Sequence, residues 1–233
     1  MDFLYEELKA QVSIVMQRHG SSGHGFDHID RVVGLALEFT ADIPEYVNSE
    51  TVLLIAMLHN VDDKKLFGSH SEEHSINARK IMNNLEISQE LQDVVCSEIK
   101  KLSFRSALKG DTPETIEGKI VSDADKCDAM GAGGLLRAYD YNFSELGSKI
   151  VFDWDIKPIA KISYEEYGTA PTHPTDTLIN HYFEKILHLP KYMLTEPGKE
   201  EANLRNLFDL DFVYHFLTEN HAPEEFYDLM KQI

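Results

Sequence analysis

The chain has 233 residues, of which 42% are hydrophobic. This length supports one substantial core and is short for two separate ones, so we expect a single domain over residues 1–233. The formal net charge of −18, from 40 acidic and 22 basic residues, gives a surface that repels polyanions and excludes a nucleic acid polymer as partner. A small phosphorylated substrate stays compatible with this charge if a cation inverts the potential at one site.

The cysteines and the amino terminus point to an intracellular protein. Only Cys96 and Cys127 are present, which excludes a disulfide framework and a cysteine-based zinc site. The first residues lack a secretory signal pattern, and no apolar segment is long enough to span a bilayer. We therefore expect a soluble, cytoplasmic protein with no membrane partner.

The chain begins with two helical patterns. Residues 2–19 carry apolar side chains at helical spacing and predict an amphipathic helix. In the next helix His28, Val32 and Phe39 share one stripe, so His28 is expected to point inward. Arg31 follows one turn later and could meet a phosphate bound beside His28.

A buried helix follows, and its end is the most informative part of the sequence. Residues 52–58 are apolar throughout and predict a helix in the core, with a start near Asn48. His59 and Asn60 come directly after this run, followed by two aspartates and two lysines. A histidine there is desolvated unless it bonds a backbone carbonyl or binds a metal ion, and we interpret His59 as a metal ligand.

Two later helices carry further candidate residues. A helix predicted from Ser71 places His74 and Ala78 on one inner line, where His74 is either a substrate contact or an imidazole at the solvent edge. In the helix predicted over 115–130, Asp125 lies at the edge of a buried face. An unpaired carboxylate would be costly at that place.

The remainder of the chain begins with a predicted irregular segment. Periodicity fades over 141–176, and a segment of this length is often a functional lid. Helical pattern returns over 177–189, with His181 and Lys185 on one stripe, and a last pair of helices is expected over 199–220 and 223–232. The predicted fold class is all-α.

Three short motifs resemble those of the HD-domain family of metal-dependent phosphohydrolases. They are His28-Ile29-Asp30-Arg31-Val32, Leu58-His59-Asn60 and Ala124-Asp125-Lys126, in the order of the family's ligand motifs. Residues 117–132 and 181–187 are further similar to stand-alone bacterial members that include nucleotide pyrophosphatases, so the resemblance covers nearly the whole chain. It implies an all-helical fold with a central metal site and a divalent cation held by imidazole and carboxylate. Such ligands suit Mn²⁺, Mg²⁺, Fe²⁺, Co²⁺ or Zn²⁺.

The chain departs from the family pattern at two positions. Asn60 stands where the family has the aspartate of its name, and Leu102 stands where the bacterial subgroup tends to carry histidine. An amide oxygen can still coordinate a hard cation, but it carries no charge, so metal affinity should fall.

The resemblance and the residue patterns together assign roles. The expected metal ligands are His28, His59, Asn60 and Asp125. Asp63 matches the position of the acid/base carboxylate in related members and, with His59, is assigned to catalysis. Expected substrate contacts are Arg31, Lys64, Lys65, His74, His181 and Lys185, although a lysine pair is also typical of a solvated surface.

Three functions are consistent with this sequence. The first is metal-dependent hydrolysis of a phosphate ester or anhydride in a small phosphorylated substrate, which we expect to be a nucleotide. The second is a catalytically weakened protein that binds a nucleotide or metal as a sensor, because Asn60 and Leu102 remove two polar positions. The third is a phosphodiesterase that acts on cyclic or tetraphosphate nucleotides.

Overall fold

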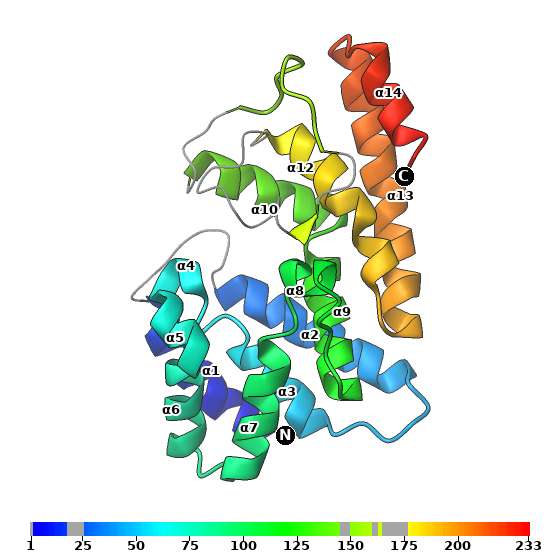
Figure 1. The fold of residues 1–233 in the computed structure, drawn as a ribbon. Helices are drawn as coiled ribbons and strands as arrows, with labels where there is room; N and C mark the ends of the chain where they lie inside the picture. Colours follow the sequence, from blue (N-terminus) through cyan, green and yellow to red (C-terminus); the bar gives the residue numbers. More distant parts are fainter. Residues whose placement is uncertain (1, 18–25, 145–149, 160–162, 165–176) are drawn as a thin grey trace. The chain divides into compact units, whose positions relative to one another are not determined.

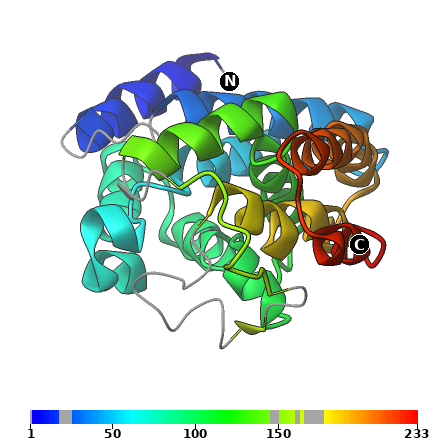
Figure 2. The same ribbon diagram turned by 90° about the horizontal axis from the view of Figure 1, so that it is seen from above.

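The structure is a computed structural model, and it describes residues 2–17, 26–144, 150–159, 163–164 and 177–233. Figures 1 and 2 show from two directions that the regular elements of these residues are helices, with no strand among them. The predicted all-α fold class is therefore confirmed. By internal contacts the chain divides into two compact units, residues 1–125 and 126–233, which are described separately below. The single domain expected over residues 1–233 stays a prediction.

The first unit is built around one helix that is buried on all sides. Its elements are α1 (Asp2–Met16), α2 (Phe26–Asp42), α3 (Ser49–Leu58), α4 (Lys64–Phe67), α5 (Ser69–His74), α6 (Ile76–Asn84), α7 (Gln89–Ile99), α8 (Phe104–Leu108) and most of α9 (Ile116–Asp128). Helix α3 packs against α1, α2 and α7, and every residue from Thr51 to Leu58 is buried. The predicted core helix is thus confirmed.

Helix α3 begins at the predicted cap. The Asn48 side chain accepts hydrogen bonds from the backbone N–H groups of Glu50 and Thr51, at 3.0 and 3.1 Å. These bonds satisfy two of the donors that the first turn of a helix leaves without a partner. The cap fixes where the helix starts, and ten residues later the helix ends at Leu58, directly before His59.

The helix predicted from Ser71 is instead two helices. Ser75 adopts a left-handed conformation (φ 51°), which ends α5 and begins α6. The Asp62 carboxylate then accepts hydrogen bonds from the N–H groups of Asn77 and Ala78, at 2.9 and 2.8 Å, and caps α6. Because the break changes the register, His74 is exposed while Ala78 is buried, and the predicted shared inner line is wrong.

The second unit packs around one long helix. Helix α13 (Glu196–Glu219) contacts α10 (Gly131–Ser144), α12 (Leu178–Glu184), the 3-10 helix η2 (Ile186–Tyr192) and α14 (Glu224–Met230). The last two helices are confirmed close to their predicted ranges. The segment predicted as helical over 177–189 is α-helical only as far as Glu184, and Pro190 lies within the 3-10 helix that follows.

Glycines allow a close backbone approach at the start of α10. A Cβ atom at Gly134 would lie 2.3 Å from the Ala129 carbonyl oxygen, so no larger residue fits without a backbone shift. Gly131 has a φ of 69° and donates its N–H to both carboxylate oxygens of Asp209, each at 3.0 Å. Helix α10 extends to Ser144, whereas the sequence predicted irregular structure from 141. Most of the lid predicted over 141–176 lies outside the described residues.

Candidate metal centre

Three side chains that are far apart in the sequence meet within the first unit. They are His28 on α2, His59 at the end of α3 and Asp125 on α9, and one ligand atom from each lies within 4.8 Å of the others. The two histidine Nε2 atoms are 3.1 Å apart, and Oδ1 of Asp125 lies 3.3 Å from Nε2 of His28 and 3.8 Å from Nε2 of His59. The structure therefore brings together three of the four predicted metal ligands.

The backbone sets the orientation of His59. Its Nδ1 lies 2.6 Å from the carbonyl oxygen of Ala56, an acceptor in the last turn of α3. When Nδ1 donates its hydrogen to this carbonyl, Nε2 of the neutral ring carries a lone pair that faces His28 and Asp125. His59 thus bonds a backbone carbonyl, and its Nε2 is left directed at the place where a metal ion could bind.

The buried face of α2 positions His28. Its side chain is 4% exposed, and the neighbouring Ile29 and Val32 are fully buried. The predicted inward direction of His28 is confirmed. Asp125 is 27% exposed, in agreement with its predicted place at the edge of a buried face. Two buried imidazoles and one accessible carboxylate leave an open side from which a substrate can approach.

The spacing of these atoms suits one divalent cation. Ligand atoms that each lie about 2.1 Å from an ion, at right angles to one another, are roughly 3 Å apart. The measured separations of 3.1 and 3.3 Å are close to this value, and the 3.8 Å separation is somewhat longer. Nitrogen and carboxylate ligands together fit Mn²⁺, Fe²⁺, Co²⁺ or Zn²⁺ well.

Asn60 lies beside the triad with a donor that has no partner. The residue is 8% exposed, and its Nδ2 makes no hydrogen bond within the described part of the chain. A buried amide without a partner costs about 1–3 kcal/mol, so such groups mark strained or ligand-binding positions. Asn60 lines the same cavity as His59 and Asp125, so its Nδ2 is a donor available to a molecule bound there.

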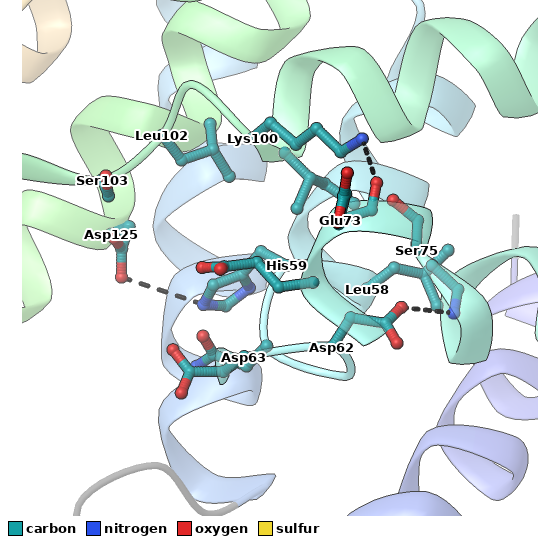
Figure 3. Close-up of a pocket in the computed structure, with 14 residues that line it drawn as sticks. Leu58, His59, Asp62, Asp63, Glu73, Ser75, Lys100, Leu102, Ser103 and Asp125 are labelled. Atoms are coloured by element: carbon teal, nitrogen blue, oxygen red, sulfur yellow. Dashed lines mark hydrogen bonds and ion pairs between the residues drawn. The ribbon is translucent and has the colours of Figure 1, made fainter. Parts of the chain in front are cut away.

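A cavity of about 460 Å³ adjoins the triad. Figure 3 shows His59 and Asp125 beside it, together with Asp63, Leu102 and Lys100. Its lining residues are Leu58, His59, Asn60, Asp62, Asp63, Glu72, Glu73, Ser75, Ala78, Ile99, Lys100, Leu102, Ser103 and Asp125. Asp63 is half-buried in this lining, where a carboxylate can reach a bound water or substrate oxygen.

Several predicted substrate contacts are not among the residues that line the cavity. Arg31, Lys64 and His74 are exposed and do not line the cavity, although His74 stacks edge-on against His70 at 4.6 Å between ring centroids. His181 and Lys185 are half-buried in the second unit. The Lys65 side chain lies outside the described structure. The substrate roles of these residues stay predictions.

The sequence pattern did not predict several residues that line the cavity. Glu72, Glu73, Lys100 and Ser103 line it, and none of them stood out from its spacing. Glu72 and Glu73 belong to a six-residue helix whose direction depends on the break at Ser75, for which the sequence carries no glycine signal. Leu102, where the bacterial subgroup tends to carry histidine, is 3% exposed and forms part of the apolar lining.

Comparison with known proteins shows what the chain is similar to. Residues 25–130, which contain all three triad residues, match the HD domain. A crystal structure of an HD-superfamily hydrolase from Bacillus thuringiensis has 26% sequence identity, a TM-score of 0.67, and coverage of 94% of this chain and 97% of that one. The chain thus contains a match to the HD domain over residues 25–130 and is similar over most of its length to an HD-superfamily hydrolase.

Two further relatives match along nearly their whole length. A crystal structure of a protein from Lactobacillus plantarum has 28% identity and a TM-score of 0.78, with 96% of this chain and 99% of that chain covered. The uncharacterised protein YpgQ of Bacillus subtilis is 29% identical over 214 residues, which cover 89% of each chain. A crystal structure of YpgQ in complex with ADP has a TM-score of 0.64, with 26% identity over 92% of this chain and 97% of that one.

Proposed function

We propose that this protein is a metal-dependent phosphohydrolase that acts on a small nucleotide. The observation that carries the proposal is the triad of His28, His59 and Asp125, whose ligand atoms have the spacing of one cation site. The adjoining cavity of about 460 Å³ is within the usual size range of small-molecule sites. The crystal structure of YpgQ with ADP supports a nucleotide as the ligand class.

The residues of the site would divide the work of hydrolysis. The two imidazoles and the Asp125 carboxylate would hold the cation, and Asn60 would add an amide oxygen. When bound, a divalent cation polarises a phosphoryl oxygen and lowers the pKa of a bound water. His59, held by its bond to Ala56, keeps its Nε2 directed at the site without rearrangement.

Asp63 would orient the attacking water and accept its proton. It follows the buried helix by one turn and lies in the cavity lining with His59. Its neighbour Asp62 is unsuited to this task, because Asn77, Ala78 and the Ser71 hydroxyl already donate hydrogen bonds to its carboxylate. Arg31 and Lys64 are exposed and do not line the cavity, and the neutralisation of substrate oxygens by these residues stays a prediction.

Asn60 motivates a second candidate function, a nucleotide or metal sensor with weakened catalysis. With an amide in place of a carboxylate, the site has one negative charge fewer and holds a cation less firmly. The two functions differ in turnover. A sensor would bind Mn²⁺ and nucleotide at the triad without rapid hydrolysis.

Restoring the family residue separates the two candidates. Wild-type protein and the Asn60→Asp variant are assayed with Mn²⁺ against a panel of nucleoside mono-, di- and triphosphates and cyclic and tetraphosphate nucleotides. Ample wild-type turnover that His59→Ala abolishes supports the hydrolase. Near-zero wild-type turnover with a large gain in Asn60→Asp supports the sensor, and turnover confined to cyclic or tetraphosphate substrates identifies a phosphodiesterase.

A further inference from the structure

The cavity beside the triad has an acidic lining. Five carboxylate residues contribute to it, namely Asp62, Asp63, Glu72, Glu73 and Asp125. Among the described lining residues, Lys100 is the only one with a permanent positive charge, and its Nζ donates a hydrogen bond to the backbone carbonyl of Glu73 at 2.7 Å. Even with a divalent cation at the triad, this lining disfavours an additional anionic group.

The wall that carries Glu72 and Glu73 is held in place by several bonds. The Lys100 contact joins the end of α5 to the end of α7. The Ser71 hydroxyl donates to the buried carboxylate of Asp62, which also caps α6. Figure 3 shows Glu73, Lys100 and Asp62 around this side of the cavity. The two glutamates are thus acceptors on a fixed frame at the cavity rim.

The other lining residues offer an apolar surface. Leu58, Ala78 and Leu102 are almost fully buried, and Ile99 is half-buried beside them. An apolar wall that faces exposed carboxylates suits a flat, uncharged group with N–H or O–H donors. A nucleoside has this chemistry, whereas a phosphate chain does not.

We propose that this cavity receives the nucleoside end of the substrate, while phosphate groups beyond the one at the triad lie outside it. The inference rests on the proposed function, and it makes Glu72 and Glu73 specificity-determining residues that accept hydrogen bonds from the base amino group or the sugar hydroxyls. Asn60, at the triad end of the cavity, directs its Nδ2 donor to a phosphoryl oxygen.

The test measures the binding of the nucleoside and of the phosphate chain in separate experiments. Calorimetry measures the binding of adenosine and of inorganic tripolyphosphate to the full-length, Mn²⁺-loaded protein. In the double variant Glu72→Gln/Glu73→Gln, adenosine binding should weaken about five- to tenfold, because charge-assisted acceptors are lost. Tripolyphosphate binding should change less than about threefold. Comparison of adenosine with 2′,3′-dideoxyadenosine shows whether the sugar hydroxyls or the base supplies the donors.

Two results would overturn the inference. In the first, the double variant binds tripolyphosphate at least about tenfold more tightly than the wild type while its affinity for adenosine is unchanged. This result would place the phosphate chain in the cavity. The other is an absence of adenosine binding to the wild-type protein. The control variant Glu38→Gln/Glu90→Gln removes two exposed charges outside the cavity lining and should match the wild type. If the double variant fails to fold, the two single variants serve the same comparison.

This test does not depend on turnover. Adenosine has no phosphate bond to cleave, so its binding is measured whether or not the protein is a hydrolase. A protein that binds adenosine through Glu72 and Glu73 but cleaves no nucleotide refutes the hydrolase proposal alone. A protein that cleaves nucleotides without this binding refutes the cavity assignment alone.

Discussion

The Nε2 atoms of His28 and His59 lie 3.1 Å apart although 31 residues separate them in the chain. Each ring presents the same type of nitrogen to the same point, and Asp125 adds a carboxylate oxygen there. A divalent cation bound at this point should therefore change the stability of the protein, and this change can be measured directly.

Metal addition should stabilise the protein only when the triad is intact. Mn²⁺ at about 100 times its dissociation constant should raise the free energy of unfolding by about 2.7 kcal/mol, and excess EDTA should reverse the gain. Thermal melts with and without Mn²⁺ measure this. His28→Ala and Asp125→Ala should lose the response, while His74→Ala, a control at an exposed histidine outside the cavity lining, should keep it. An equal response in all four proteins would place the metal elsewhere.

Removal of the Asp62 carboxylate and removal of the Asp63 carboxylate should affect different properties of the protein. Asp62→Ala takes the cap from α6 and leaves buried donors without an acceptor, so it should cost about 2–3 kcal/mol in urea unfolding. Asp63→Ala should leave stability within about 0.5 kcal/mol and instead lower kcat. If the stability loss followed Asp63 and the activity loss followed Asp62, the assigned roles would be reversed.

The effect of Asn60→Asp on thermal stability should depend on whether Mn²⁺ is present. Asn60→Asp adds a negative charge beside Asp125, so the metal-free variant should melt below the metal-free wild type. With saturating Mn²⁺ the order should invert, because a carboxylate binds the cation more firmly than an amide. Melting curves of both proteins over a Mn²⁺ titration provide the measurement. Curves that never cross would show that residue 60 does not contact the ion.

Asp209 should make stability depend on pH. Burial raises the pKa of this carboxyl group to about 6, although the Gly131 N–H and nearby Arg205 oppose the rise. Between the ordinary pKa of 3.8 and about 6, the folded state binds more protons than the unfolded state. The free energy of unfolding therefore falls as the pH rises through this window, by on the order of 3 kcal/mol.

The variant Asp209→Asn isolates this contribution. Its amide oxygen can still accept from Gly131, but it does not ionise. Urea unfolding at several pH values between 4 and 7 should show the variant gaining stability relative to the wild type as the pH rises. A constant difference across this range would mean that Asp209 does not titrate there.

The sequence predicted the helical fold and the triad because both depend on local signals. The apolar run before His59 predicts a buried segment, and the Asn48 cap predicts that this segment is a helix and where it begins. Helical periodicity predicts the inward direction of His28 and the edge position of Asp125, while their grouping with His59 was implied by the resemblance of three short motifs to the HD-domain family. None of these signals needs information about distant contacts.

The wall of the cavity could not be predicted in the same way. The left-handed Ser75 ends α5 without glycine, so helical periodicity continued across the break and placed His74 on the wrong face. Asp62 acts as a cap for a helix that begins 14 residues later, a relationship that requires the folded chain. Helix α10, which has 14 residues, was likewise not predicted in full, because the three glycines at its start disfavour a helix.

The anchor of His59 has a consequence for how the site tolerates mutation. The acceptor at Ala56 is a main-chain carbonyl, which every amino acid possesses. Substitutions at position 56 can disturb packing in the core, but they cannot delete the group that orients the imidazole. The orientation of His59 is therefore set by the path of the backbone, and small apolar substitutions at position 56 that preserve helix α3 should leave it unchanged.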